Sequence, residues 1–77
     1  MSRQVVSTRG IATDIGSEVR RRRLKSAKVR TQSALADSAG ISISFLSMIE
    51  RGERLPTIET LFRIAAALGV PPSRLLS

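Results

Sequence analysis

The residue types that usually catalyse reactions or hold metals are scarce in this chain. It contains no His and no Cys, which excludes imidazole and thiolate metal sites and the common nucleophile–base pairs. The six acidic residues are scattered and form no carboxylate pair suited to acid–base catalysis. The sequence therefore predicts a protein that is not an enzyme and has neither a cofactor nor a metal site.

Positive charge is the chemical feature that the sequence does concentrate. Thirteen Lys and Arg residues against six Asp and Glu residues give a formal net charge of +7. Such a field attracts polyanions, nucleic acid first and an anionic membrane surface second. More than half of the basic residues lie in one run that contains no acid: Arg20, Arg21, Arg22, Arg23, Lys25, Lys28 and Arg30. The simplest alternative explanation for this run is a solvated helix face.

Residues 32–52 have the sequence pattern of two short helices joined by a tight turn. Gly40 stands at the break, Ser42 stands where the second helix would begin, and Gly52 stands after its end. At about 100° per residue, Leu46 and Ile49 of the second helix fall on one side with Ser42. The opposite side of this helix collects Ile43, Ser44, Ser47, Met48 and Arg51.

That opposite side has only one charged residue, which is unusual for a helix face in water. In the major groove of DNA, a serine can bond a base or a phosphate, and Ile43 or Met48 can pack on a thymine methyl group. The alternative is that Ile43 and Met48 cover part of the fold or of a protein partner. No Asn, Gln or Arg stands at the N-terminal base-facing positions, so we expect DNA shape to contribute to recognition.

The surrounding sequence predicts the helices that position this segment. Residues 1–13 show no sustained period, and we interpret them as a mobile tail or an arm that reaches DNA. Residues 14–77 form one domain, whose first helix we expect to begin after Thr13. Thr31 and Thr57 are candidate N-caps of two further helices.

The C-terminal part has the clearest helical period. Its apolar residues Ile58, Leu61, Ile64, Ala65 and Leu68 follow the i, i+3, i+4, i+7 rule. Gly69 should stop this helix, and Pro71 and Pro72 permit one more short helical turn. No segment has the pattern of a strand, so we expect an all-α domain of five short helices.

Two sequence features argue against a membrane or secreted location. The longest apolar stretch, residues 64–68, is too short to cross a bilayer. The N-terminus lacks the apolar core of a signal peptide. We therefore expect the protein to remain in the cytoplasm.

These residues resemble the Cro and phage-repressor type of helix-turn-helix, also called the xenobiotic response element family. The resemblance covers about residues 14–77, and its most specific part is the Ile-Glu-Arg-Gly tract at 49–52, followed by Pro56 and by Leu-x-x-Ile-Ala-x-Ala-Leu at 61–68. It implies a compact five-helix, lambda-repressor-like domain that binds a palindromic DNA operator as a homodimer. A transcription regulator of the repressor, autoregulator or restriction–modification controller type would fit.

The resemblance also implies roles for single residues. Base-facing positions correspond to Ile43, Ser44, Ser47 and Met48. Contacts with the DNA backbone are assigned to Thr31, Gln32, Ser42, Arg51, Arg54 and Thr57. Dimer contacts are expected from the C-terminal end, with Val70, Leu75 and Leu76 as apolar candidates.

The first helix departs from the family pattern, in which an arginine pairs with the acid that corresponds to Glu50. Counting from Ile15-Gly16 gives Arg23 as this partner, whereas counting back from Gln32 gives Lys25. The chain therefore has a two-residue insertion, and we expect a bulge or an early end in the first helix. We favour Arg23, because a guanidinium forks onto a carboxylate.

Three further points follow from the basic run and its neighbours. Four consecutive arginines surround a helix, so we expect one to be internal and paired. Arg30 stands at a position where the family is apolar, and Val29 is the candidate to replace it. Two other classes of function stay open: an antitoxin or protein-interaction module with the same fold, and a membrane-surface peptide built on residues 19–25.

Overall fold

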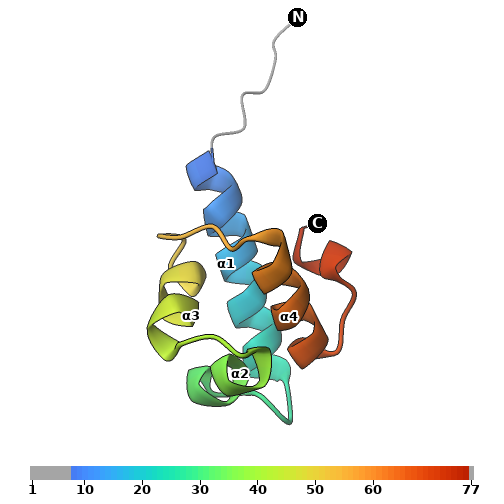
Figure 1. The fold of residues 1–77 in the computed structure, drawn as a ribbon. Helices are drawn as coiled ribbons and strands as arrows, with labels where there is room; N and C mark the ends of the chain where they lie inside the picture. Colours follow the sequence, from blue (N-terminus) through green and yellow to red (C-terminus); the bar gives the residue numbers. More distant parts are fainter. Residues whose placement is uncertain (1–7, 77) are drawn as a thin grey trace, which may run out of the picture.

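The computed structural model describes residues 8–76, which form an all-α fold (Figure 1). The elements are α1 (Thr8–Lys25), α2 (Gln32–Ala39), α3 (Ile43–Glu50), α4 (Ile58–Leu68) and the 3-10 helix η1 (Pro72–Leu75). No strand occurs within residues 8–76, and no helix there is long and apolar enough to cross a membrane. The expected fifth α-helix is a single 3-10 turn, because Pro71 and Pro72 lack the amide hydrogens that an α-helix needs.

The helix α1 begins earlier than the sequence indicated. It starts at Thr8, so residues 8–13 of the predicted tail are helical and Thr13 is not an N-cap. Ala12 is buried one turn before Ile15 and two turns before Val19, and this burial extends the packed stripe of α1 toward the N-terminus. The rest of the predicted tail, residues 1–7, lies outside the described residues.

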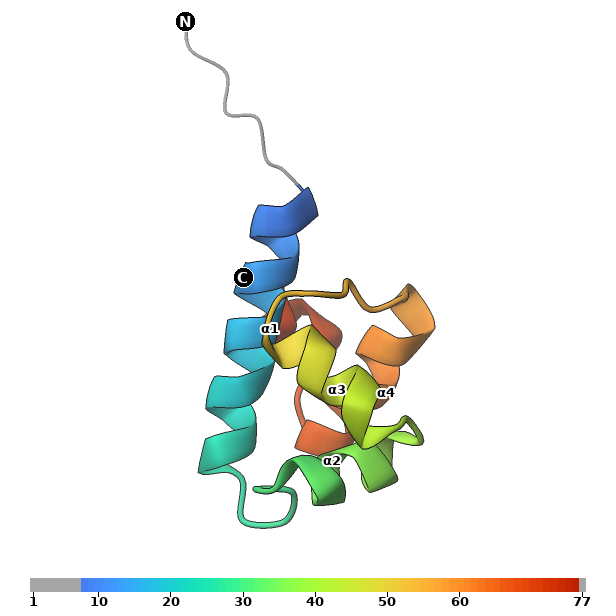
Figure 2. The same ribbon diagram turned by 90° about the vertical axis from the view of Figure 1, so that its left-hand side faces the viewer.

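The elements α3, α4 and η1 pack against α1, and one side of α3 is left free. Helix α3 packs against α1 and α2, and α2 also packs against α4. Figure 2 shows α3 at the near surface, with α1 on one side and α4 on the other. The shared core consists of Ile15, Val19, Val29, Leu35, Ala36, Ala39, Leu46, Ile49, Leu61, Ile64, Ala65 and Leu75.

Side-chain caps set the starts of the three short helices, as the sequence predicted. The hydroxyls of Thr31, Ser42 and Thr57 each accept a hydrogen bond from the backbone amide three residues later. Gly40 ends α2 with a left-handed backbone, φ 71°, which side chains with a Cβ rarely adopt. The α2–α3 turn is therefore encoded by Gly40 and Ser42 together.

The insertion that the sequence predicts between Val19 and Gln32 does not distort α1. Helix α1 is continuous to Lys25, so the expected bulge or early end is wrong. The loop 26–31 follows α1, and the Ser26 hydroxyl shapes that loop by accepting from the amides of Lys28 and Val29. Leu24 is 49% exposed, whereas Val29 is buried in the core, as predicted for the residue that replaces Arg30 there.

Helices α1 and α3 approach each other closely at Gly16. A Cβ atom added there would lie 2.1 Å from the Ile49 carbonyl oxygen and 3.0 Å from the Glu50 carbonyl oxygen. Both neighbours are backbone atoms, which cannot move aside as a flexible side chain would. Gly16 therefore sets the distance between α1 and α3.

We predict that Gly16→Ala destabilises the domain by about 3 kcal/mol, because the new methyl group forces the two backbones apart. Urea unfolding followed by circular dichroism measures this loss. Ser17→Ala is the matched control, since Ser17 is the exposed neighbour on the same helix and its replacement should change stability by less than about 0.5 kcal/mol. Equal stability of the Gly16→Ala variant and the parent protein would contradict the close crossing.

Candidate nucleic-acid interface

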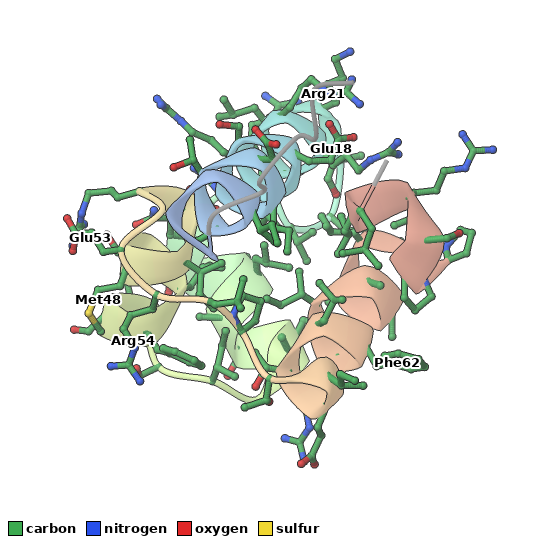
Figure 3. The ribbon with its side chains drawn as sticks, turned by 90° about the horizontal axis from the view of Figure 1, so that it is seen from above. Glu18, Arg21, Met48, Glu53, Arg54 and Phe62 are labelled. Carbon is green, nitrogen blue, oxygen red and sulfur yellow. The ribbon has the colours of Figure 1, made fainter. Side chains whose placement is uncertain are left out.

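The outward side of α3 is the only part of this helix that meets solvent broadly. Leu46 and Ile49 on its inner side are fully buried. On its outer side Ile43 and Ser44 are exposed, and Ser47 and Met48 are half-buried. Figure 3 shows Met48 pointing away from the domain. The side chains of Gln32, Ile43, Ser44, Ser47, Met48 and Arg51 together line a shallow groove, which we call the α3 groove.

The structure thus brings the four predicted base-facing residues into one groove, with two of the predicted backbone contacts at its edge. Three others, Thr31, Ser42 and Thr57, lie at the starts of α2, α3 and α4. Their hydroxyl oxygens accept from helix amides. The hydroxyl group of Thr57 also donates its hydrogen to Thr60. Within residues 8–76, the hydroxyl groups of Thr31 and Ser42 act only as acceptors.

A buried cluster lies behind the α3 groove and joins three helices. Arg23 of α1 donates from Nε to Glu50 Oε2 at 2.6 Å and from Nη2 to Glu50 Oε1 at 2.9 Å. Gln32 of α2 donates from Nε2 to Glu50 Oε1 at 3.0 Å. Arg23 also donates to the Arg30 carbonyl oxygen. Glu50 is therefore paired with Arg23, not Lys25, and Gln32 is partly committed to the scaffold.

A second polar cluster lies at the surface beside the groove. Arg51 donates from Nε and Nη2 to the two carboxylate oxygens of Glu53, at 2.9 Å and 3.0 Å. Its remaining nitrogen, Nη1, donates to the Ser47 hydroxyl oxygen. These hydrogen bonds lower the pKa of Glu53 below its usual value and raise the pKa of Arg51. Arg51 is held against its neighbours and does not project freely toward solvent.

Arg54 has a different support. Its guanidinium carbon lies 5.6 Å from the centroid of the Phe45 ring, within the range of a cation–π contact. Phe45 belongs to α3, so this contact couples the loop after α3 to the helix itself. The support of Arg54 by Phe45 could not be inferred from helical spacing, because the loop conformation decides it.

The arginine run of α1 is only partly neutralised within the chain, because two carboxylates serve three of its arginines. Arg21 and Arg22 both donate to Glu18, and the bonds from Arg21 hold the pKa of Glu18 below its usual value. Arg23 is internal and paired, as one member of the run was expected to be. The run therefore contributes mainly a long-range field.

The candidate dimer residues are distributed differently from the sequence prediction. Leu75 is 1% exposed and belongs to the core of its own chain, so its burial requires no second copy. Val70 is partly buried against the same core. Leu76 is 59% exposed and stays a candidate. Two other large apolar residues are exposed on α4, Ile58 at 75% and Phe62 at 56%.

Two short helices, a left-handed glycine turn between them and an exposed groove along the second helix define a helix-turn-helix domain. The model of the HTH_3 helix-turn-helix family matches residues 19–75, most of the chain. The chain belongs to this family, whose members bind DNA.

Curated relatives are named as regulators of transcription. The chain is 47% identical over 45 residues to the HTH-type transcriptional regulator SutR of Escherichia coli (strain K12), covering 58% of this chain and 25% of that protein. It is 46% identical over 41 residues to the cryptic phage CTXphi transcriptional repressor RstR of Vibrio cholerae, covering 53% and 37%. The chain spans less than two thirds of the length of the curated relatives it matches.

Solved structures show the same fold. The restriction-modification controller protein C.AhdI from Aeromonas hydrophila superimposes with a TM-score of 0.77 at 26% identity, covering 83% of this chain and 94% of that one. An HTH_3 family transcriptional regulator from Vibrio cholerae superimposes with a TM-score of 0.80 at 31% identity, covering 90% and 38%.

We predict that Arg23→Met costs about 3–5 kcal/mol of stability, because it leaves the Glu50 carboxylate buried without its cation. The double variant Arg23→Met, Glu50→Met removes both charges and should recover much of this loss. Urea unfolding followed by circular dichroism compares the two. Arg21→Met, which removes an exposed arginine of the same run, should cost less than about 1 kcal/mol. An equal loss in the single and double variants would show that an uncompensated charge is not the cause.

Proposed function

We propose that this chain binds double-stranded DNA in a sequence-specific way, as a homodimer on a palindromic operator, and so regulates transcription. The observation that supports this most is the α3 groove. It presents two hydroxyls, two apolar side chains and a neutralised arginine, on a helix whose inner side is fully buried. Relatives named as a phage repressor and as a restriction-modification controller fit the same activity.

Helix α3 suits the major groove of DNA in both size and chemistry. An eight-residue helix inserted there would bring Ser44 and Ser47 to base edges, and Ile43 and Met48 to thymine methyl groups. Thr31 and Ser42, at the starts of α2 and α3, would donate to phosphates on either side. Arg54, supported by Phe45, would contact the backbone from the following loop.

A second copy of the chain is the partner that the outer side of α4 fits. Ile58 and Phe62 are one turn apart and exposed, and beside them Arg63 donates to Glu59 at 2.8 Å. If two α4 helices met antiparallel across a two-fold axis, Glu59 of each copy would face Arg63 of the other, around an apolar centre. A self-complementary surface of this kind is what a two-fold dimer requires. Leu76 lies elsewhere, in a hollow lined by Ile11 and Ile15 of α1, and stays a separate candidate.

We predict that selection from a library of random duplexes enriches a two-fold symmetric sequence. Its half-sites should lie about 34 Å apart, the distance between two recognition helices on one face of DNA. Several phosphate contacts per dimer should weaken binding by about a hundredfold or more between about 50 and 200 mM salt. Fluorescence anisotropy titrations measure the affinity for the selected duplex at each salt concentration. Equal affinity for the selected duplex and its scrambled version would refute sequence-specific regulation.

We predict that Phe62→Glu raises the dimer dissociation constant by about a hundredfold or more, since it places a charge at the centre of the apolar surface. Sedimentation equilibrium without DNA measures the constant. Leu24→Glu is the matched control, because Leu24 is an exposed leucine on α1 outside the proposed dimer surface. A Phe62→Glu protein that dimerises like the parent protein would rule out this surface.

A further inference from the structure

Glu53 is an acidic residue in the place where a DNA-binding protein should avoid one. It follows α3 by three residues, is about half exposed, and lies beside Met48 at the outer side of the domain (Figure 3). In a chain with a net charge of +7, a carboxylate at this surface repels phosphate. Its position therefore calls for a physical reason.

We propose that Glu53 is a positioning residue for base recognition. Acting through Arg51, it sets the Ser47 hydroxyl as a hydrogen-bond donor toward DNA. This inference rests on the proposed function and names a determinant of its specificity.

The three side chains form a continuous chain of hydrogen bonds. Both oxygens of Glu53 accept from Arg51, in the fork geometry that suits a guanidinium. This fork orients the guanidinium plane, so that the third nitrogen reaches the Ser47 hydroxyl oxygen. Ser47 lies on α3 and Arg51 is the C-cap residue of that helix, one turn later, whereas Glu53 belongs to the following loop.

The consequence for Ser47 follows from the chemistry of a hydroxyl group. Its oxygen can accept hydrogen bonds, but the group has one hydrogen to donate. A charged guanidinium on the oxygen occupies one lone pair and withdraws electron density, which makes the hydroxyl a poorer acceptor and a better donor. The hydroxyl hydrogen is then the part of Ser47 left for a partner in the α3 groove.

Donation by Ser47 would select among bases. In the major groove guanine, adenine and thymine all offer acceptor atoms, whereas cytosine offers only its amino donor. At the base that Ser47 contacts, the protein should therefore discriminate against cytosine. A single such hydrogen bond corresponds to a preference of about three- to tenfold.

Glu53 is needed because Arg51 alone would have a stronger alternative. A free guanidinium beside DNA is drawn to a phosphate, and moving there would release Ser47. By occupying two of the three guanidinium nitrogens, Glu53 offsets that attraction and keeps Arg51 on the hydroxyl. The protein would thereby lose some general affinity for DNA and gain discrimination at one base.

The test compares variants on one panel of duplexes. The parent protein first selects a sequence from random duplexes, and dissociation constants are then measured for all four bases at each position. Ser47→Ala identifies the position that Ser47 reads. Glu53→Gln should reduce the discrimination against cytosine at that same position by about three- to tenfold, and leave the other positions unchanged. The double variant Ser47→Ala, Glu53→Gln should show no further reduction.

Two more variants separate position from charge. Arg51→Lys keeps the positive charge but cannot fork onto Glu53 while reaching Ser47, so it should also relax that one position. Asp37→Asn, which removes an exposed acid on α2, should leave base preference intact. Circular dichroism confirms that each variant is folded.

The outcomes are distinct. If Glu53→Gln tightens binding to every duplex alike and leaves the base preference unchanged, Glu53 only repels phosphate and the proposal is wrong. If Glu53→Gln relaxes all positions alike, its role is general and the proposal is again wrong. A failure of the parent protein to enrich any sequence would instead refute the proposed function itself.

Discussion

The buried bond between Arg23 and Glu50 is the interaction on which the orientation of α3 depends. Its two hydrogen bonds join α1 to the last residue of α3, and Gln32 adds α2 to the same carboxylate. Gly16 lets the two helices come close enough for this pair to form. Arg23 also donates to the carbonyl oxygen of Arg30, so the loop 26–31 is tied to the same point.

A buried ion pair is a costly way to hold helices together if stability alone matters. Removing two charges from water offsets much of their attraction, and apolar replacements often do equally well. What the pair adds is direction, because the planar guanidinium forks onto the carboxylate with two hydrogen bonds at once. An eight-residue helix such as α3 has little stability of its own, so the elements packed against it must fix the direction of its axis. We interpret the cluster as the device that supplies this axis.

Much of this arrangement could be predicted from the sequence, because it rests on local chemistry. The caps at Thr31, Ser42 and Thr57, the turn at Gly40 and the buried side of α3 all follow from residue type and spacing. The missed features depend on tertiary packing. Ala12 has too small a side chain to extend the apparent period of α1, and the burial of Leu75 requires η1 to fold back over the core.

The surface cluster was missed for a related reason. Ser47 and Arg51 are spaced for contact on a helix, so that half was visible in the sequence. The other half depends on the loop after Gly52, where the backbone turns through a φ of 76° and returns Glu53 toward Arg51. No periodicity encodes such a return. Loop conformation therefore limits what spacing rules can say about the interface.

The two polar clusters act on the same helix at different levels. The Arg23–Glu50 cluster is shielded from solvent, so salt screens it little, whereas the Arg51–Glu53 pair is half exposed and within reach of counterions. We therefore expect the orientation of α3 to be insensitive to ionic strength. The proposed orientation of the Ser47 hydroxyl should depend on ionic strength. A DNA-reading helix with few polar side chains can gain selectivity when one cluster fixes the helix axis and another fixes a hydroxyl group on it. Each of its few hydrogen bonds then has a defined donor and acceptor.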